Sequence, residues 1–104
     1  MNQPLLVLFT PRAGRQADDA AAWWREHRSK APNAFAEELE RALELIAAEP
    51  GVGARARNAR LAGVRRVLLH RVRYYLYYRI VEAPERLVQI LAVWHAQRGS
   101  GPLI

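Results

Sequence analysis

The chain has 104 residues, of which 51% are hydrophobic and 25% charged, with no cysteine and a formal net charge of +6. This length fits one domain over residues 1–104, and no apolar run approaches the roughly 20 residues of a membrane span. The lack of cysteine excludes disulfides, thiolate chemistry and cysteine-ligated zinc, and His27, His70 and His95 are too widely spaced to predict a metal site. The N-terminal run PLLVLF lacks the charged region of a signal peptide. We therefore expect a cytoplasmic protein without metal, other cofactor or membrane partner.

The first half of the chain predicts one strand followed by two helices. Residues 5–9 (LLVLF) form a short apolar run between prolines, which is typical of a buried strand. Thr10 can cap a helix that holds Pro11 in its first turn and continues to about Arg28. A second apolar stripe of helical period covers about 32–48 and ends at a Pro-Gly pair. Because the link between them is short, the two helices should form an antiparallel hairpin.

The second half predicts strands. After a loop over 51–63 the apolar period changes from that of a helix to that of a strand. We expect strands at 64–71 and 72–81, joined by a tight bend or bulge near 70–72, then a turn and a third strand at 86–95. The third strand is apolar on both faces and should therefore be central in the sheet. The tail AQRGSGPLI is turn-like, and we expect its last residues to be loose.

This order, β-α-α-β-β-β, predicts an α+β fold in which the helical hairpin packs on one face of a small, mostly antiparallel sheet. Alternate side chains of the segment RVRYYLYYRI should point to opposite faces of that sheet. The residues expected against the helices are Val72, Tyr74, Leu76, Tyr78 and Ile80. Those expected on the open face are Arg73, Tyr75, Tyr77, Arg79 and Val81, beside Gln89, Val93 and His95 of the neighbouring strand.

Positive charge is concentrated in the second half of the chain. Residues 1–49 carry six basic and eight acidic residues, a net charge of −2, whereas residues 50–104 carry ten arginines and two acids, a net charge of +8. Between Glu49 and Glu82 there are eight arginines and no acid. Such a field attracts nucleic acid or an acidic protein segment, unless it is only a solvated basic face.

Five features occur in a set order along the chain. They are the β-α-α-β-β-β arrangement, the break at Pro50, Gly51 and Gly53, the segment Leu61-Ala62-Gly63, the strand RYYLYYRI and the ending ILAVWHAQRGSGP. Together they resemble the RelE/ParE superfamily, the toxins of type II toxin–antitoxin systems that are often called plasmid stabilisation proteins. The resemblance covers nearly the whole chain, and it implies the same RelE/ParE-like fold.

The resemblance implies one of three activities. RelE-like members are ribosome-dependent mRNA endonucleases that use no metal; a ribose 2′-OH attacks the adjacent phosphate, with acid–base help and cations that stabilise the developing charge. ParE-like members share the fold, lack that residue set and inhibit growth by poisoning DNA gyrase. A non-toxic family member would only bind antitoxin.

The residues favour the ParE-like branch, and so a protein that is not an enzyme. RelE-type nucleases commonly have an arginine after the tyrosine of the middle strand, whereas here Tyr75 follows Tyr74. The preceding strand, VRRVLLHR, lacks their lysines, and no tyrosine follows Tyr78. The ending WHAQRG, with His95 and Arg98, resembles that of ParE proteins. In the nuclease alternative the catalytic candidates would be His95, Arg73, Arg79 and Arg98.

Two surfaces are expected to bind partners. The residues expected to contact the target are Arg73, Tyr75, Tyr77, Arg79, His95 and Arg98. The residues expected to contact the antitoxin are Trp23, Trp24, Arg65 and Arg66. The tyrosines could equally be cross-strand packing partners, and His95 a structural histidine. Because Trp23 and Trp24 are adjacent on a helix, only one of them should face the core.

The expected partners follow from the resemblance and the charge together. The family pattern implies a cognate, ParD-like antitoxin whose acidic, poorly folded C-terminal segment folds over the toxin in a hetero-oligomer. A positive toxin surface would steer that association. The pattern also implies that operator DNA is bound through the antitoxin, and we expect no sequence-specific DNA binding by this chain alone.

Overall fold

A computed structural model describes residues 3–104. Its elements, in chain order, are β1 (Leu6–Phe9), α1 (Pro11–His27), α2 (Ala34–Ala48), β2 (Ala54–Arg55), β3 (Arg65–Leu69), β4 (Tyr74–Val81) and β5 (Leu87–His95). Except for the two-residue β2, every element was predicted, with ends that shift by a few residues. Neither helix of this part of the chain is long and apolar enough to cross a membrane.

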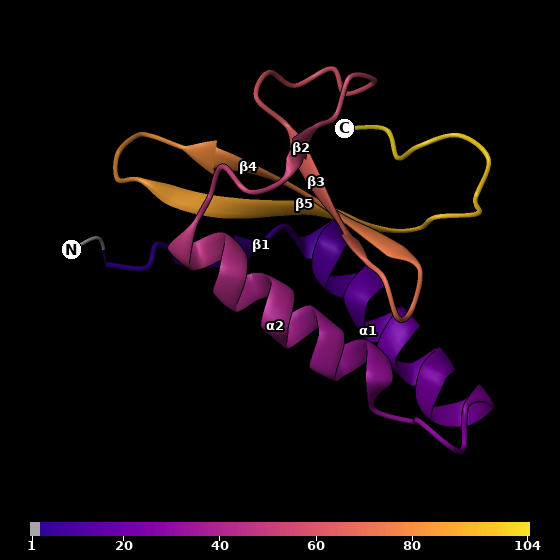
Figure 1. Cartoon of the computed structure of the whole chain (residues 1–104). Helices are drawn as coiled ribbons and strands as arrows, with labels where there is room; N and C mark the ends of the chain where they lie inside the picture. The colour runs from indigo at the N-terminus through magenta and orange to yellow at the C-terminus, as the bar shows by residue number, and fades with distance from the viewer. Residues whose placement is uncertain (1–2) are drawn as a thin grey trace.

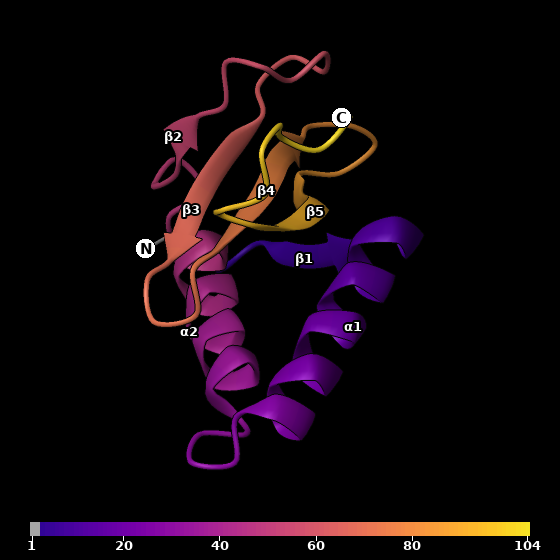
Figure 2. The same ribbon diagram turned by 90° about the vertical axis from the view of Figure 1, so that its right-hand side faces the viewer.

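Both helices lie on the same side of a five-stranded sheet (Figure 1). The strand order is β1-β5-β4-β3-β2, with β1 parallel to β5 and all other neighbours antiparallel. Figure 2 shows the helices as a V that opens toward the sheet, with their short connection at the far end. The predicted α+β fold is therefore confirmed, and β5 has a paired strand on each side, as expected for a central strand.

The main core fills the space between the helices and the sheet. Thr10 caps α1 as predicted, because its Oγ1 accepts a hydrogen bond of 3.1 Å from the backbone N–H of Ala13. The buried face of α1 is made of alanines, which let the helix approach β5 closely. The predicted core residues Leu76 and Tyr78 are both 0% exposed. The prediction for the helix-facing side of β4 is therefore confirmed at these two positions.

A bulge in β5 reverses the direction of the side chains at the end of that strand. The pairing of β4 with β5 shifts between Tyr77 and Tyr78, which leaves Leu91 as an extra residue. Because one extra residue exchanges the two faces of a strand, Val93 packs into the core beneath the helices and His95 follows it to that side. The prediction that Val93 and His95 lie on the open face is wrong.

The bend predicted near 70–72 is present as a turn over 70–73, and β4 begins at Tyr74. The backbone N–H groups of Val72 and Arg73 both donate to the carbonyl of Leu69, at 3.2 and 2.7 Å. Arg73 has a φ of 64°. It therefore belongs to the turn and not to the strand, so the prediction that Arg73 lies on the open face of β4 is wrong.

The second face of the sheet has a small core of its own. Tyr77, Leu91 and Ala92 are buried there, packed against Val64 and partly buried residues that include Ile104. The segment after β2 and the C-terminal segment provide the cover, and both lie across the sheet from the helices (Figure 1). The open face is thus partly covered.

The C-terminal segment is held in place by hydrogen bonds and by burial. The backbone N–H of Arg60 donates to the carbonyl of Ile104 at 2.6 Å, and Arg12 Nη1 donates to that of Leu103 at 2.9 Å. Pro102 is buried. The prediction of a loose tail is wrong, because its proline and its last residue pack on the second face of the sheet.

The hydroxyl of Tyr78 fixes the loop between α2 and β2. It donates to the carbonyl of Pro50 at 2.7 Å and accepts from the N–H of Gly53 at 2.8 Å. A Cβ at Gly53 would lie 2.7 Å from that hydroxyl oxygen, so a glycine is required at this close approach. Arg65 Nη1 donates to the carbonyl of Gly53 at 2.7 Å. These bonds hold β2 beside β3, a pairing too short to leave a pattern in the sequence.

Candidate functional site

A cleft of about 430 Å³ lies among the end of α1, the turn over 70–73 and the end of β5. We call it the tryptophan cleft; its lining residues are Trp23, Trp24, Arg28, Arg71, Val72, Arg73, Tyr74, His95 and Gln97. Trp23 is 41% exposed, whereas Trp24 is partly buried and packs against the main core. The two tryptophans thus divide between solvent and core as expected for neighbours on a helix.

The aromatic side of the tryptophan cleft is ordered by stacking. The guanidinium of Arg28 lies 4.6 Å from the ring centre of Trp23 and 5.6 Å from that of Trp24. The ring of His27 stacks on Trp23 with 4.7 Å between ring centres. Cation–π contacts of this kind hold an exposed indole in one orientation. The cleft therefore offers a fixed aromatic surface next to a positive charge.

The turn over 70–73 brings further cations to the tryptophan cleft. Arg71 pairs with Glu37 at 3.5 Å, in a bridge whose two side chains are about half exposed. Arg73 is exposed, and its backbone lies in the left-handed region of the φ/ψ map. This conformation costs on the order of 1 kcal/mol relative to an ordinary one. Backbone outliers of this kind cluster at ligand-binding sites. Exposed arginine and aromatic surface thus meet at one place.

His95 lines the tryptophan cleft at the end of β5. Its ring lies edge-on to Tyr74, with 5.0 Å between ring centres, and its Nδ1 accepts a hydrogen bond of 3.1 Å from the backbone N–H of Gln97. This bond assigns the proton of the neutral ring to Nε2. Burial raises the pKa of Tyr74 above that of a free tyrosine. The pair therefore has the packing of a structural aromatic contact.

On the other face of the sheet, the tyrosines of β4 hold an arginine of β3. The guanidinium of Arg66 lies 4.0 Å from the ring centre of Tyr75, and its Nη1 donates to the hydroxyl of Tyr77 at 3.3 Å. Farther along β4, Arg79 Nε donates to Gln89 Oε1 at 2.9 Å. Tyr75 and Tyr77 therefore act first as partners for a cation of the same sheet.

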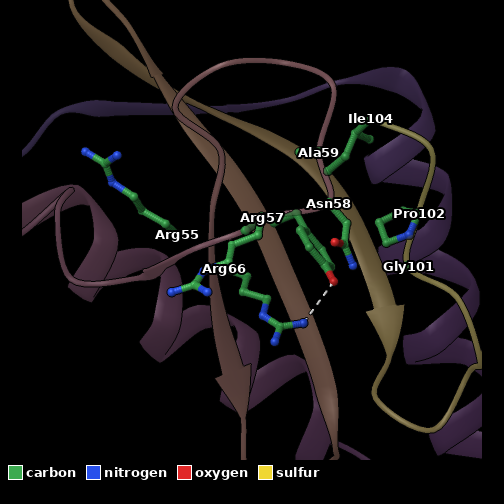
Figure 3. A pocket seen from close by; sticks show the side chains of 10 residues that line it. Arg55, Arg57, Asn58, Ala59, Arg66, Gly101, Pro102 and Ile104 are labelled. Carbon is green, nitrogen blue, oxygen red and sulfur yellow. Dashed lines mark hydrogen bonds between the residues drawn. The ribbon is translucent and has the colours of Figure 1, made fainter.

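A pocket of about 310 Å³ opens beside Arg66, and we call it the arginine pocket. Its lining residues are Arg55, Ala56, Arg57, Asn58, Ala59, Arg66, Tyr77, Gly101, Pro102 and Ile104. Figure 3 shows the arginines on one side of this pocket and the C-terminal segment on the other. It is a polar concavity with three guanidinium groups, and it lies on the face of the sheet away from the helices.

The structure separates residues that the sequence groups together. Of the six expected target contacts, Arg73 and His95 line the tryptophan cleft, whereas Tyr75, Tyr77 and Arg79 lie on the opposite face of the sheet. Arg98 stacks over the ring of Trp94 at 4.3 Å, near the end of β5. One continuous surface of these six residues is therefore not present.

The expected antitoxin contacts are divided in the same way. Trp23 and Trp24 line the tryptophan cleft, whereas Arg66 lines the arginine pocket. Arg65 pairs with Tyr78 across the strands and therefore points to the opposite side of β3 from Arg66. Sequence reasoning missed Arg28, Arg55 and Arg57 as site residues. Arg28 follows Trp24 by one helical turn, a spacing that could have revealed the stack.

The arrangement of the helices, the sheet and the two cavities defines the structural class of the protein. Two helices lie on one face of a mixed sheet, with an aromatic cleft on one side and a basic pocket on the other, which describes a small α+β protein with two separate concave surfaces. Within residues 3–104, no three histidine or carboxylate side chains are grouped as metal ligands.

The family follows from comparison with known proteins. The family model of the ParE toxin of type II toxin–antitoxin systems (parDE) matches residues 7–99, so the chain belongs to this family. A solved chain described as "Chromosomal ParDE TA system from P. aeruginosa" has a TM-score of 0.62 and 20% sequence identity, covering 89% of this chain and 97% of that chain. At this low sequence identity, the structural similarity shows that the two chains share a fold. No curated protein sequence matches the chain.

Proposed function

We propose that this ParE-family toxin acts in the cytoplasm by poisoning DNA gyrase, and that it is not an enzyme. Family membership supports a toxin with an antitoxin partner. We also propose that the chain belongs to the wider RelE/ParE superfamily and that a ParD-like antitoxin neutralises it in a hetero-oligomer. In that assembly operator DNA is bound through the antitoxin.

The observation that carries the proposal is the separation of Arg79 from His95, since Arg73 and Arg98 line cavities that also include His95. His95 is paired with Tyr74 and Arg79 with Gln89. Five residues of β4 separate these positions, which is about 17 Å at 3.3 Å per residue, and the two side chains point to opposite faces. A general acid, a general base and a stabilising cation must all reach one phosphate within hydrogen-bonding distance. This geometry excludes Arg79 from a catalytic site at His95, and so supports a toxin that acts by binding a protein over one that cleaves RNA with all four candidates.

The tryptophan cleft is the proposed antitoxin site. An exposed, oriented tryptophan is a common anchor of protein interfaces, and the apolar side of an amphipathic segment would pack on Trp23. Arg28 and Arg73 would meet acidic side chains of the same segment. The chemistry of the cleft therefore matches an acidic segment that folds on binding.

Expression of the toxin without antitoxin tests the proposed target. Supercoiling of a reporter plasmid, DNA breaks and protein synthesis are followed in parallel from the moment of induction. We expect supercoiling to fall and breaks to appear first, and we expect extra gyrase to restore growth. Arrest of protein synthesis before any change in supercoiling would contradict the gyrase proposal.

Two further outcomes separate the remaining activities. His95→Ala should abolish cleavage by a nuclease that uses His95 as an acid or base, whereas a gyrase poison, in which His95 is one expected target contact among six, should keep most of its toxicity. A thermal melt of the variant excludes misfolding, since His95 packs on Tyr74. Normal growth on induction, with antitoxin binding retained, would identify a non-toxic family member.

A further inference from the structure

Most arginines of the basic segment have no acidic neighbour in the structure. Eight arginines lie between Glu49 and Glu82. Among residues 3–104, the only one of these eight that pairs with a carboxylate is Arg71, at 3.5 Å from Glu37. The antitoxin site proposed at the tryptophan cleft gives no role to Arg55 and Arg57, which line the arginine pocket. A concave site with several uncompensated guanidinium groups attracts an anion.

One cation of the arginine pocket is already held in position. Arg66 is stacked on Tyr75 at 4.0 Å and bonded to Tyr77 at 3.3 Å. A guanidinium has five N–H donors, of which the hydrogen bond to Tyr77 uses one and the contact with the Tyr75 ring uses none. Because Tyr77 is only 7% exposed, this support is rigid. Arg66 thus presents its remaining donors without losing further side-chain freedom.

The positive surface continues past the pocket. A second concavity of about 460 Å³ lies against the same segment and is lined by Arg55, Arg57 and Arg65 together with Leu61, Gly63 and neighbouring residues. Arg55 and Arg57 line both concavities, and both side chains are exposed. The cations therefore follow a track along β2 and the segment after it, and they are not gathered at a single point.

A track of this kind fits a ligand with evenly spaced negative charges. The arginine pocket offers guanidinium groups, the amide of Asn58 and the hydroxyl of Tyr77, but no exposed aromatic anchor comparable to Trp23. An acidic amphipathic peptide needs such an anchor, whereas a nucleic-acid backbone is bound through its phosphates alone. We propose that the arginine pocket binds phosphates of the DNA backbone without sequence selectivity.

This proposal goes beyond gyrase poisoning and does not depend on it. In a complex of toxin, gyrase and DNA, the pocket would hold the toxin against the DNA that the enzyme carries. The pocket is tested on DNA without gyrase, so a toxin that binds DNA but spares gyrase, or the reverse, distinguishes the two proposals. The expected weak, non-selective binding agrees with operator recognition by the antitoxin.

The experiment measures binding of a fluorescent duplex DNA of arbitrary sequence by anisotropy at several salt concentrations. Contact with three phosphates predicts that affinity falls by about 40-fold between about 50 and 200 mM salt. Arg57→Gln should lower the salt dependence by about one contact and weaken binding about eightfold near 0.1 M salt. The double variant Arg55→Gln, Arg57→Gln should lose about two contacts.

Arg41→Gln is the matched control, because Arg41 is an exposed arginine of α2 that pairs with Glu38 at 3.6 Å. It removes the same charge from the helix side of the protein and should leave DNA binding nearly unchanged. Equal weakening by Arg41→Gln and Arg57→Gln would overturn the proposal in favour of diffuse charge. Equal or tighter binding of an oligoglutamate of matched charge would overturn it in favour of an acidic peptide, and sequence-selective binding would contradict it as well. Melting curves verify that each variant is folded.

Discussion

The tryptophan cleft and the arginine pocket both contain arginines, yet they offer different chemistry. In the tryptophan cleft, Arg28 stacks on an exposed indole, so charge and apolar area occur together. In the arginine pocket, Arg66 stacks on a tyrosine inside the sheet, and the ring is a support for the cation. The total charge of +6 therefore says little about the partner. The ring on which each guanidinium stacks, and the side of the sheet on which that ring lies, say more about the partner.

The largest expected effect is at the tryptophan cleft. Trp23→Ala should weaken antitoxin binding by about 2 kcal/mol, roughly 30-fold, because truncation removes the exposed anchor. DNA binding should not change, since the arginine pocket lies across the sheet. Calorimetric titration with the cognate antitoxin measures the effect. Leu45→Ala, which truncates an exposed apolar residue of α2 outside the cleft, serves as the control. Equal weakening by both variants would mean that the tryptophan cleft is not the specific site of antitoxin binding.

The next effect is on stability and concerns the loop between α2 and β2, which leads toward the arginine pocket. Tyr78→Phe removes both hydrogen bonds to the loop, leaving the buried N–H of Gly53 and the partly buried carbonyl of Pro50 without this partner. We expect a loss of about 1–3 kcal/mol, which is a fall in Tm of at least several degrees. Chemical denaturation measures the change. At temperatures where the variant is folded, DNA binding should weaken while antitoxin binding is kept, because the released loop leads into β2.

The same tyrosine predicts a pH dependence. Burial raises the pKa of Tyr78, although the N–H of Gly53 and the charge of Arg65 oppose this shift. The folded protein therefore holds the proton more tightly than the unfolded chain, whose tyrosine pKa is about 10. Stability should be complete below that value and fall as the pH rises through the higher pKa of the folded state. Denaturation at increasing alkaline pH should show a steeper loss for the wild type than for Tyr78→Phe, and parallel curves would exclude Tyr78 as the source.

The fold could be predicted from the sequence because the apolar residues of its helices and strands repeat with clear periods. The alternation in YYLYY assigned Tyr78 to the core, and the Thr10-Pro11 pair located the start of α1. The bulge could not be predicted, because β5 is apolar at nearly every position and no alternation of apolar and polar residues marks where Leu91 is inserted. That one residue moved His95 to the opposite face from Tyr75. The types of residue at the candidate site were therefore predicted from the sequence, but the way in which they are grouped in space was predicted wrongly.

Two other features depend on contacts between distant parts of the chain. Arg73 continues an alternating pattern and so reads as a strand residue, but the hydrogen bonds to Leu69 place it in a turn. The segment after Pro102 has the composition of a loose tail, and only the buried surface around Tyr77 shows where it packs. Local propensity contains no information about either contact. The arginine pocket, which is made from such a loop and tail, could not be predicted.

The smallest expected effect isolates how Arg66 is held. Tyr77→Phe removes a hydroxyl that accepts from Arg66 at 3.3 Å, a long and therefore weak bond, while the ring stays buried in the second core. Stability should change by less than about 1 kcal/mol. Because the stack on Tyr75 still holds the guanidinium, DNA affinity should fall only about twofold in the anisotropy assay, a loss of about 0.4 kcal/mol. Tyr74→Phe, which changes the same strand on the cleft side, should leave DNA binding as it is. A loss as large as that of Arg57→Gln would mean that the hydroxyl of Tyr77 contacts the phosphate itself, and the pocket would then recognise its ligand by more than charge.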